Sequence, residues 1–183
     1  MKRQTSLLLA IGIAAAACST NQLDPAQIDN VVDTITLGAL IGTSISTPSA
    51  YSIPDARAVR TDQTAAFDFA YNIDATGRRL LLPLDALGLG AANASNPGLQ
   101  KSAETFAGLT NPPTNGYLTK DSIVVATGDV LVARSRIACF LGVPEYAKLQ
   151  ILSFDDAKRT VRFQVLANVN CGYRNLEIGI PTS

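Results

Sequence analysis

The side chains that could do chemistry in this sequence are mainly carboxylates. Asp68 and Asp74 fall on the polar side of a predicted strand pair, and a facing pair of carboxylates is the machinery of a glycosidase. Asp155 and Asp156 are adjacent, so in a turn they would accept hydrogen bonds from backbone amides; a calcium site is the alternative there. Nothing in the sequence places two carboxylates together, and solvated surface acids are the simpler interpretation. A carboxylate-based hydrolase is therefore the third-ranked hypothesis.

Arginines and aromatic residues offer a second set of candidates. Arg134 and Arg136 share a predicted strand face with two valines. They could form a small anion site, and pairing with surface acids is the alternative. The aromatic residues Phe140, Tyr146 and Tyr173 lie near cysteines in the sequence and are interpreted as core or rim packing.

Two absences restrict the chemistry further. The chain has no His, and its only Met is Met1. Without His, the Ser-His-Asp and Cys-His nucleophilic arrangements and the HExxH zinc site are excluded as usually built. The commonest general base near neutral pH is also missing. We therefore expect a protein that is not an enzyme, with no catalytic residue, no metal ligand and no cofactor.

The charge balance gives no sign of a nucleic-acid partner. Lys plus Arg equals Asp plus Glu at 15 each, and removal of an N-terminal signal with Lys2 and Arg3 leaves 13 basic and 15 acidic residues. A protein that binds nucleic acid usually carries a basic field. With 47% hydrophobic and 16% charged residues, the chain fits one globular domain with a core.

The N-terminus has the organisation of an export signal. Lys2 and Arg3 precede an apolar run over residues 7–17, which ends in small residues before Cys18. The run is too short to span a bilayer as a helix and has the size of a signal-peptide core. We expect residues 1–17 to be a signal peptide, 18–23 a cysteine with a short tether, and 24–183 a single, mostly β domain.

The sequence Ala15-Ala16-Ala17-Cys18 resembles the lipobox of bacterial lipoproteins. This resemblance implies a diacylglycerol on Cys18, and hence a protein attached to a membrane of the bacterial cell envelope. Ser19 follows the cysteine where an Asp would imply inner-membrane retention, so the outer membrane is the favoured site. The alternative is an ordinary secretory signal with a cysteine after its cleavage site.

With Cys18 lipidated, two cysteines remain. Cys139 and Cys171 would then form a disulfide, since exported proteins fold in an oxidising compartment. The alternatives are two free thiols or a metal site. Two Cys and no His make a poor metal site, because zinc usually takes four nitrogen or sulfur ligands.

Two hairpins are predicted from residues that alternate between apolar and polar. Val161, Phe163, Val165 and Ala167 form one apolar face, and the less regular run over residues 146–154 precedes it across the polar turn 155–159. In the second hairpin, residues 67–73 alternate in the same way, a turn follows at 75–77, and residues 78–84 return.

A helix is predicted over residues 21–40. Asp24 suits the cap, Pro25 suits the first helical position, and apolar residues follow at spacings of three and four up to Gly38. Many of these residues are β-branched, which disfavours a helix.

Short strands with Gly and Pro between them dominate the rest. Residues 85–113 should be a long surface excursion with one strand near 100–106, and 122–127 a further strand. The fold class predicted is all-β: an antiparallel sandwich or small barrel with one N-terminal helix and a C-terminal disulfide.

The segments GDVLVARSR, EYAKLQILSFDD and TVRFQV resemble the C-terminal strands of HmuY-type lipoproteins, which are haem-binding β-proteins of outer membranes. The likeness extends over about 50 residues and implies an all-β lipoprotein. The haem ligands of that family are His or Met, and neither follows the predicted signal. No functional residue is therefore carried over, and no cofactor is expected.

These observations leave three hypotheses. The first is a non-enzymatic envelope lipoprotein that binds another envelope protein as an interaction or accessory module. The second is a carrier with a small ligand inside the barrel or sandwich. The hydrolase is the third.

Overall fold

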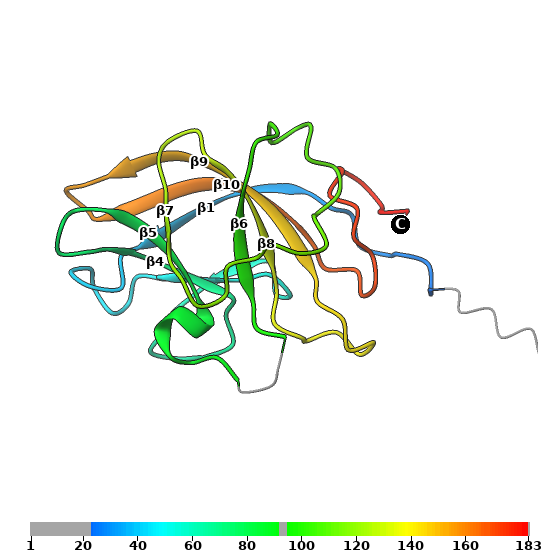
Figure 1. The fold of residues 1–183 in the computed structure, drawn as a ribbon, viewed down its shortest axis with the longest axis horizontal. Coiled ribbons are helices and arrows are strands. Elements are labelled where there is room, and N and C mark those ends of the chain that lie inside the picture. Colours follow the sequence, from blue (N-terminus) through cyan, green and yellow to red (C-terminus); the bar gives the residue numbers. More distant parts are fainter. Residues whose placement is uncertain (1–22, 92–94, 183) are drawn as a thin grey trace, which may run out of the picture.

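The computed structural model describes residues 23–91 and 95–182. They form two five-stranded sheets in which every pairing is antiparallel. The first sheet has the order β1 (Val32–Gly38), β10 (Thr160–Asn168), β9 (Tyr146–Asp155), β8 (Val130–Arg134) and β6 (Gly98–Ser102). The second has the order β3 (Arg57–Val59), β2 (Ala50–Ser52), β4 (Phe69–Ile73), β5 (Arg79–Pro83) and β7 (Ile123–Val124). Figure 1 shows their arrangement.

The sheets pack face to face, so the predicted all-β sandwich is confirmed. Their shared core contains eighteen buried residues. At its centre, Tyr51 and Phe69 from one sheet meet Phe163 from the other, with ring centroids 5.6–6.2 Å apart. The side chains that alternate along β10 explain this packing: Val161, Phe163 and Val165 point into the core.

Both predicted hairpins are present. β9 and β10 pair from Tyr146↔Asn168 to Asp155↔Thr160, with a register shift between Arg162 and Phe163. β4 and β5 pair from Phe69↔Pro83 to Ile73↔Arg79. The predicted strands near 100–106 and 122–127 correspond to the shorter strands β6 and β7.

The predicted N-terminal helix is wrong over the described residues. Residues 32–38 form β1, an edge strand paired with β10, and residues 23–31 contain no helix. In β1, Ile35 and Leu37 reach the core while Thr34 and Thr36 alternate with them. Because β-branched residues fit a pleated, half-buried surface, pairing with β10 overrides the helical spacing. Residues 21 and 22 lie outside the described part of the chain.

The predicted surface excursion folds back onto the outer face of the first sheet. Leu109, with Phe106 and Tyr117 beside it, covers Val130 and Val132 of β8. Lys148 of β9 is buried beneath this cover, where its Nζ donates to the Leu109 carbonyl (3.0 Å). The excursion therefore covers a second, smaller hydrophobic core. The only helical element among the described residues is the 3₁₀ turn η1 (Leu84–Leu87), and none of these residues forms a helix that could cross a bilayer.

Candidate functional site

The loop that joins β8 to β9 carries one cysteine of the disulfide. We call residues 136–144 the disulfide loop. Cys139 in this loop is bonded to Cys171, with Cα atoms 5.5 Å apart, so the predicted pairing is confirmed. Ser135 and Glu145 close the base of the loop: the Ser135 amide donates to the Glu145 carbonyl, and the Glu145 amide donates to the Ser135 hydroxyl (2.9 Å each).

The tip of the disulfide loop is apolar and exposed. The Phe140 side chain is 81% exposed, and Ile137, Leu141 and Val143 are also among the exposed large hydrophobic residues. Large apolar residues in a row are usually buried. The expectation that Phe140 packs in the core or its rim is therefore wrong. Tyr146, in contrast, packs against Leu166 and Leu176.

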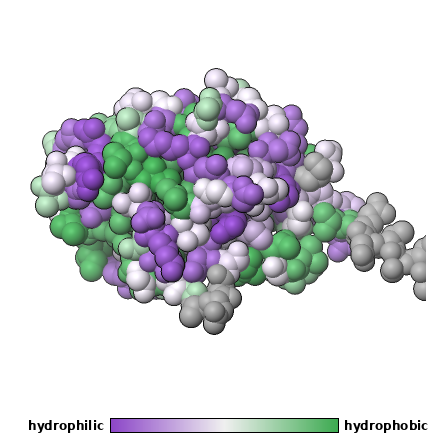
Figure 2. All heavy atoms as spheres, in the orientation of Figure 1, coloured by the Kyte–Doolittle hydropathy of each residue, from purple (hydrophilic) through white to green (hydrophobic). Residues whose placement is uncertain are grey.

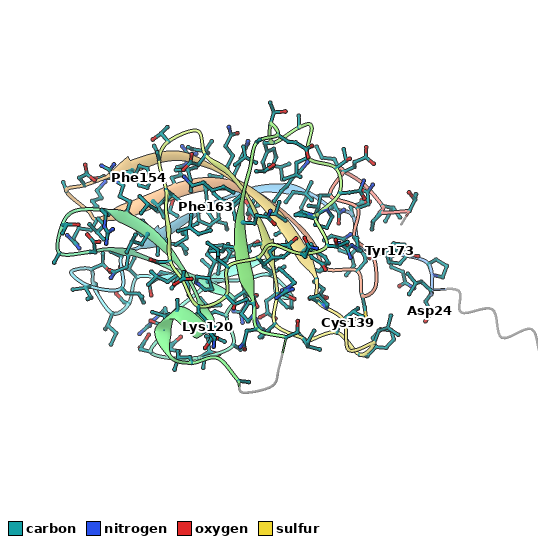
Figure 3. The ribbon with its side chains drawn as sticks, in the orientation of Figure 1. Asp24, Lys120, Cys139, Phe154, Phe163 and Tyr173 are labelled. Carbon is teal, nitrogen blue, oxygen red and sulfur yellow. A yellow bond between two sulfur atoms is a disulfide. The ribbon has the colours of Figure 1, made fainter. Side chains whose placement is uncertain are left out.

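The first described residues lie beside this loop, held by the segment around Cys171. The Asn170 side-chain oxygen accepts hydrogen bonds from the amides of Gln27 (3.1 Å) and Ile28 (3.0 Å), and its nitrogen donates to the Ile28 carbonyl (2.8 Å). The Tyr173 hydroxyl donates to the Asp24 carbonyl (3.0 Å). Figure 3 shows Asp24, Tyr173 and Cys139 at the same end of the molecule.

Between these segments lies an open groove of about 950 Å³. Residues 23–28 form one wall, the disulfide loop with Cys139 and Phe140 forms another, and residues 169–171 and Tyr173 complete it. Its size lies within the range of small-molecule sites. The groove is outside the sandwich, whose space between the sheets is filled by the core. The groove is therefore a different place from the internal site that the carrier hypothesis supposed.

Two acidic residues line the groove, Asp24 and Glu145, and of these Glu145 is the buried one. Glu145 is buried, and burial raises its pKa to about 7; the nearby charges of Asp68 and Asp55 act in the same direction, while Arg136 opposes them. Its Oε2 has no hydrogen-bond partner among the described residues. No signal in the sequence distinguishes Glu145 from other acids, since it is a single acidic residue between Pro144 and a strand.

A buried ion pair fixes the start of the disulfide loop. Asp68, before β4, accepts hydrogen bonds from the Arg136 amide (2.7 Å), the Arg136 guanidinium (3.2 Å) and the Ile53 amide (2.7 Å). Ser52 and Asp55 complete the surroundings of the guanidinium. Burial raises the pKa of Asp68, and Arg136 and Ile53 oppose that shift. The pair ties the loop to the second sheet.

The other predicted residues have structural roles. The interpretation of Asp68 as a solvated acid is wrong, because Asp68 is 1% exposed. Asp68 and Asp74 stand before and after β4, so they do not form a facing pair; Asp74 instead accepts from Thr76 and Arg78 in the β4–β5 turn. Asp155 accepts from the Lys158 amide, as predicted for a turn.

The arginines and the remaining acid are also accounted for. Asp156 pairs with Arg79 across the two sheets (2.8 Å). Arg136 binds an acid, as one alternative supposed, but does so in the interior. Arg134 stacks its guanidinium over Tyr117. No group of three or more His, Cys, Asp or Glu among the described residues could hold a metal ion.

Comparison with known protein families, curated proteins and solved structures finds no match to this chain. The predicted signal peptide (1–17) and lipidated Cys18 lie outside the described residues. They stay predictions.

Proposed function

We propose that this chain is a non-enzymatic lipoprotein of the bacterial envelope, attached by a lipid on Cys18, and that it binds another envelope protein as an accessory module. The outer membrane is the proposed location, because Ser19 rather than Asp follows the cysteine. The observation that carries the proposal is that the molecule exposes apolar side chains at two opposite ends.

One end is the point at which the chain leaves toward Cys18. There, Leu23 and the disulfide loop expose apolar side chains. β1 then runs away from this end, and seven residues of strand extend about 23 Å. The loop that follows β1 carries Ile41 and Ile45, which are 68% and 73% exposed. An anchor at one end would leave these two isoleucines facing away from the membrane.

The far end has the features of a small protein-binding surface. Its two exposed isoleucines stand on a loop fixed by Arg159, whose Nε donates to the Ile41 carbonyl (3.0 Å). Nearby, Arg79 at the start of β5 pairs with Asp156 in the β9–β10 turn. An apolar centre with a charged rim is typical of protein interfaces.

A small ligand in the groove is the second candidate. The favouring observation is the groove itself, which is about 950 Å³ and combines apolar walls with polar groups, among them the buried Glu145 carboxyl. A ligand with one hydrogen-bond donor and an apolar body would fit this chemistry.

Photo-crosslinking in the source envelope tests the proposal. A photoreactive residue replaces Ile45, and a matched variant carries it at the exposed Lys120. We expect Ile45 to crosslink one envelope protein in the membrane fraction, with Lys120 giving none. Failure of Ile45 to crosslink any protein, together with a small molecule retained in native mass spectrometry, would favour the carrier function instead.

A further inference from the structure

We infer that the disulfide loop is a second membrane contact, whose Phe140 side chain enters the lipid bilayer beside the anchor. The inference rests on the lipid anchor of the proposed function and adds a membrane-facing surface to it. The surface consists of the disulfide loop and the described segments next to it.

Exposed apolar side chains concentrate at this end of the molecule. Of the fifteen large hydrophobic residues exposed in the described chain, ten belong to three segments, 23–32, 137–143 and 178–180. Figure 2 shows a hydrophobic area at the lower right, in the region of the disulfide loop. Clusters of this kind mark interaction or membrane surfaces, whereas single exposed apolar residues are normal.

The three segments are joined by direct contacts. Asn30 and Gly179 exchange backbone hydrogen bonds (2.8 and 3.0 Å), which brings 178–180 beside the N-terminal segment. Leu23 and Leu141 both lie over Gly172: a Cβ built there would be 2.7 Å from Leu23 Cδ2 and 3.0 Å from Leu141 Cδ1. The apolar surface is thus continuous with the point where the chain leaves toward Cys18.

The short chain between Cys18 and Leu23 indicates that this surface contacts lipid. Cys18 and Leu23 are five residues apart, and extended chain spans at most about 3.6 Å per residue, so Leu23 lies within about 18 Å of the lipidated sulfur. That sulfur would sit at the lipid headgroups. A surface that begins at Leu23 is therefore held at the bilayer, where lipid is the first apolar phase it meets.

The composition and rigidity of the loop suit the interface. Residues 137–143 contain no charged side chain, and Tyr173 on the neighbouring segment adds an aromatic ring with a polar tip, the kind of residue enriched at membrane interfaces. The disulfide and the Arg136–Asp68 pair hold the loop in place. Insertion of Phe140 into lipid would therefore cost little conformational entropy, because the loop is already ordered.

Tryptophan fluorescence tests the inference directly, because the chain contains no Trp. Phe140→Trp and the matched variant Ile45→Trp each introduce one reporter at an exposed apolar position, at opposite ends of the molecule. The mature full-length proteins, purified from membranes, are reconstituted into phosphatidylethanolamine–phosphatidylglycerol vesicles, with and without brominated acyl chains. Flotation of the vesicles reports the anchor independently.

We expect the emission of Phe140→Trp to shift to shorter wavelength and to be quenched by brominated lipid, while Ile45→Trp shows neither change. Protein that floats while Phe140→Trp is unquenched would overturn the inference and leave the anchor intact. A blue shift without quenching would also overturn it, since it indicates contact with protein, including a second copy of this chain. Protein that does not float would remove the anchor and the inference together.

Discussion

The side chains of Leu23 and Leu141 converge over the Cα of Gly172, although they come from the N-terminal segment and the disulfide loop. Gly172 has a φ of +88°, and the absence of a side chain leaves room for both leucines. This contact joins the start of the described chain to the loop that carries Phe140. It therefore sets how the apolar surface is presented.

Gly172→Ala should destabilise the fold and disturb the groove. Left-handed backbone costs a residue with a Cβ about 1–2 kcal/mol, and displacement of Leu23 and Leu141 would add to that. Gly77→Ala is the matched control, because Gly77 has a similar φ of +81° and nothing within 4 Å of its Cβ position. Urea denaturation should show the larger loss for Gly172→Ala. Equal losses of stability in the two variants would mean that displacement of Leu23 and Leu141 adds nothing to the cost of Gly172→Ala.

Removal of the disulfide should lower the free energy of unfolding by about 3–4 kcal/mol in the chain-entropy model. Cys139 and Cys171 are 32 residues apart and enclose the whole β9–β10 hairpin. The Cys139→Ser/Cys171→Ser double variant avoids a free thiol, and reduction of the unmodified protein serves as a second measurement. An unchanged denaturation midpoint in both cases would contradict the prediction.

Arg136→Met should cost about 3 kcal/mol, because it leaves the buried Asp68 carboxylate without its cation. The methionine retains the apolar length of the arginine stem. Adding Asp68→Asn should recover part of the loss, since the amide oxygen still accepts from the Ile53 amide and no charge is buried. A double variant less stable than Arg136→Met alone would refute this account of the pair.

Glu145 should make the fold less stable as the pH rises. Its pKa in the folded protein is about 7, above the ordinary value of 4.5, so the folded state binds the proton more tightly than the unfolded state. Stability is then lost as the pH rises from about 4.5 to about 7, by up to 2–3 kcal/mol. Thermal melts of Glu145→Gln should lose this slope. If the melting temperature of the variant fell as steeply with rising pH as that of the parent, this prediction would be contradicted.

Parts of the fold were predictable because the evidence for them is local. Val161, Phe163 and Val165 alternate with polar residues, and a short polar turn precedes them, so one segment of sequence specifies the β9–β10 hairpin. The disulfide followed from chemistry and compartment rather than geometry. The two cysteines were the only ones left to pair once Cys18 was assigned to lipid.

Other parts depend on contacts between distant residues. Ile35 and Leu37 fit both a helix and a strand, and pairing with β10, more than 120 residues later, decides between them. Asp68 lies between two phenylalanines, a weak sign of burial, but its partner Arg136 is 68 residues away. The exposure of Phe140 was unpredictable for another reason, since hydrophobic runs are normally buried.

The central claim is the lipid anchor, and the mass of the N-terminal peptide tests it most directly. The protein is extracted from source membranes, digested, and its N-terminal peptide analysed by mass spectrometry. The account predicts a peptide that begins at Cys18 and carries the added mass of a diacylglycerol. An unmodified peptide beginning at or after Cys18 would contradict the anchor, and with it the orientation proposed for the apolar end of the sandwich.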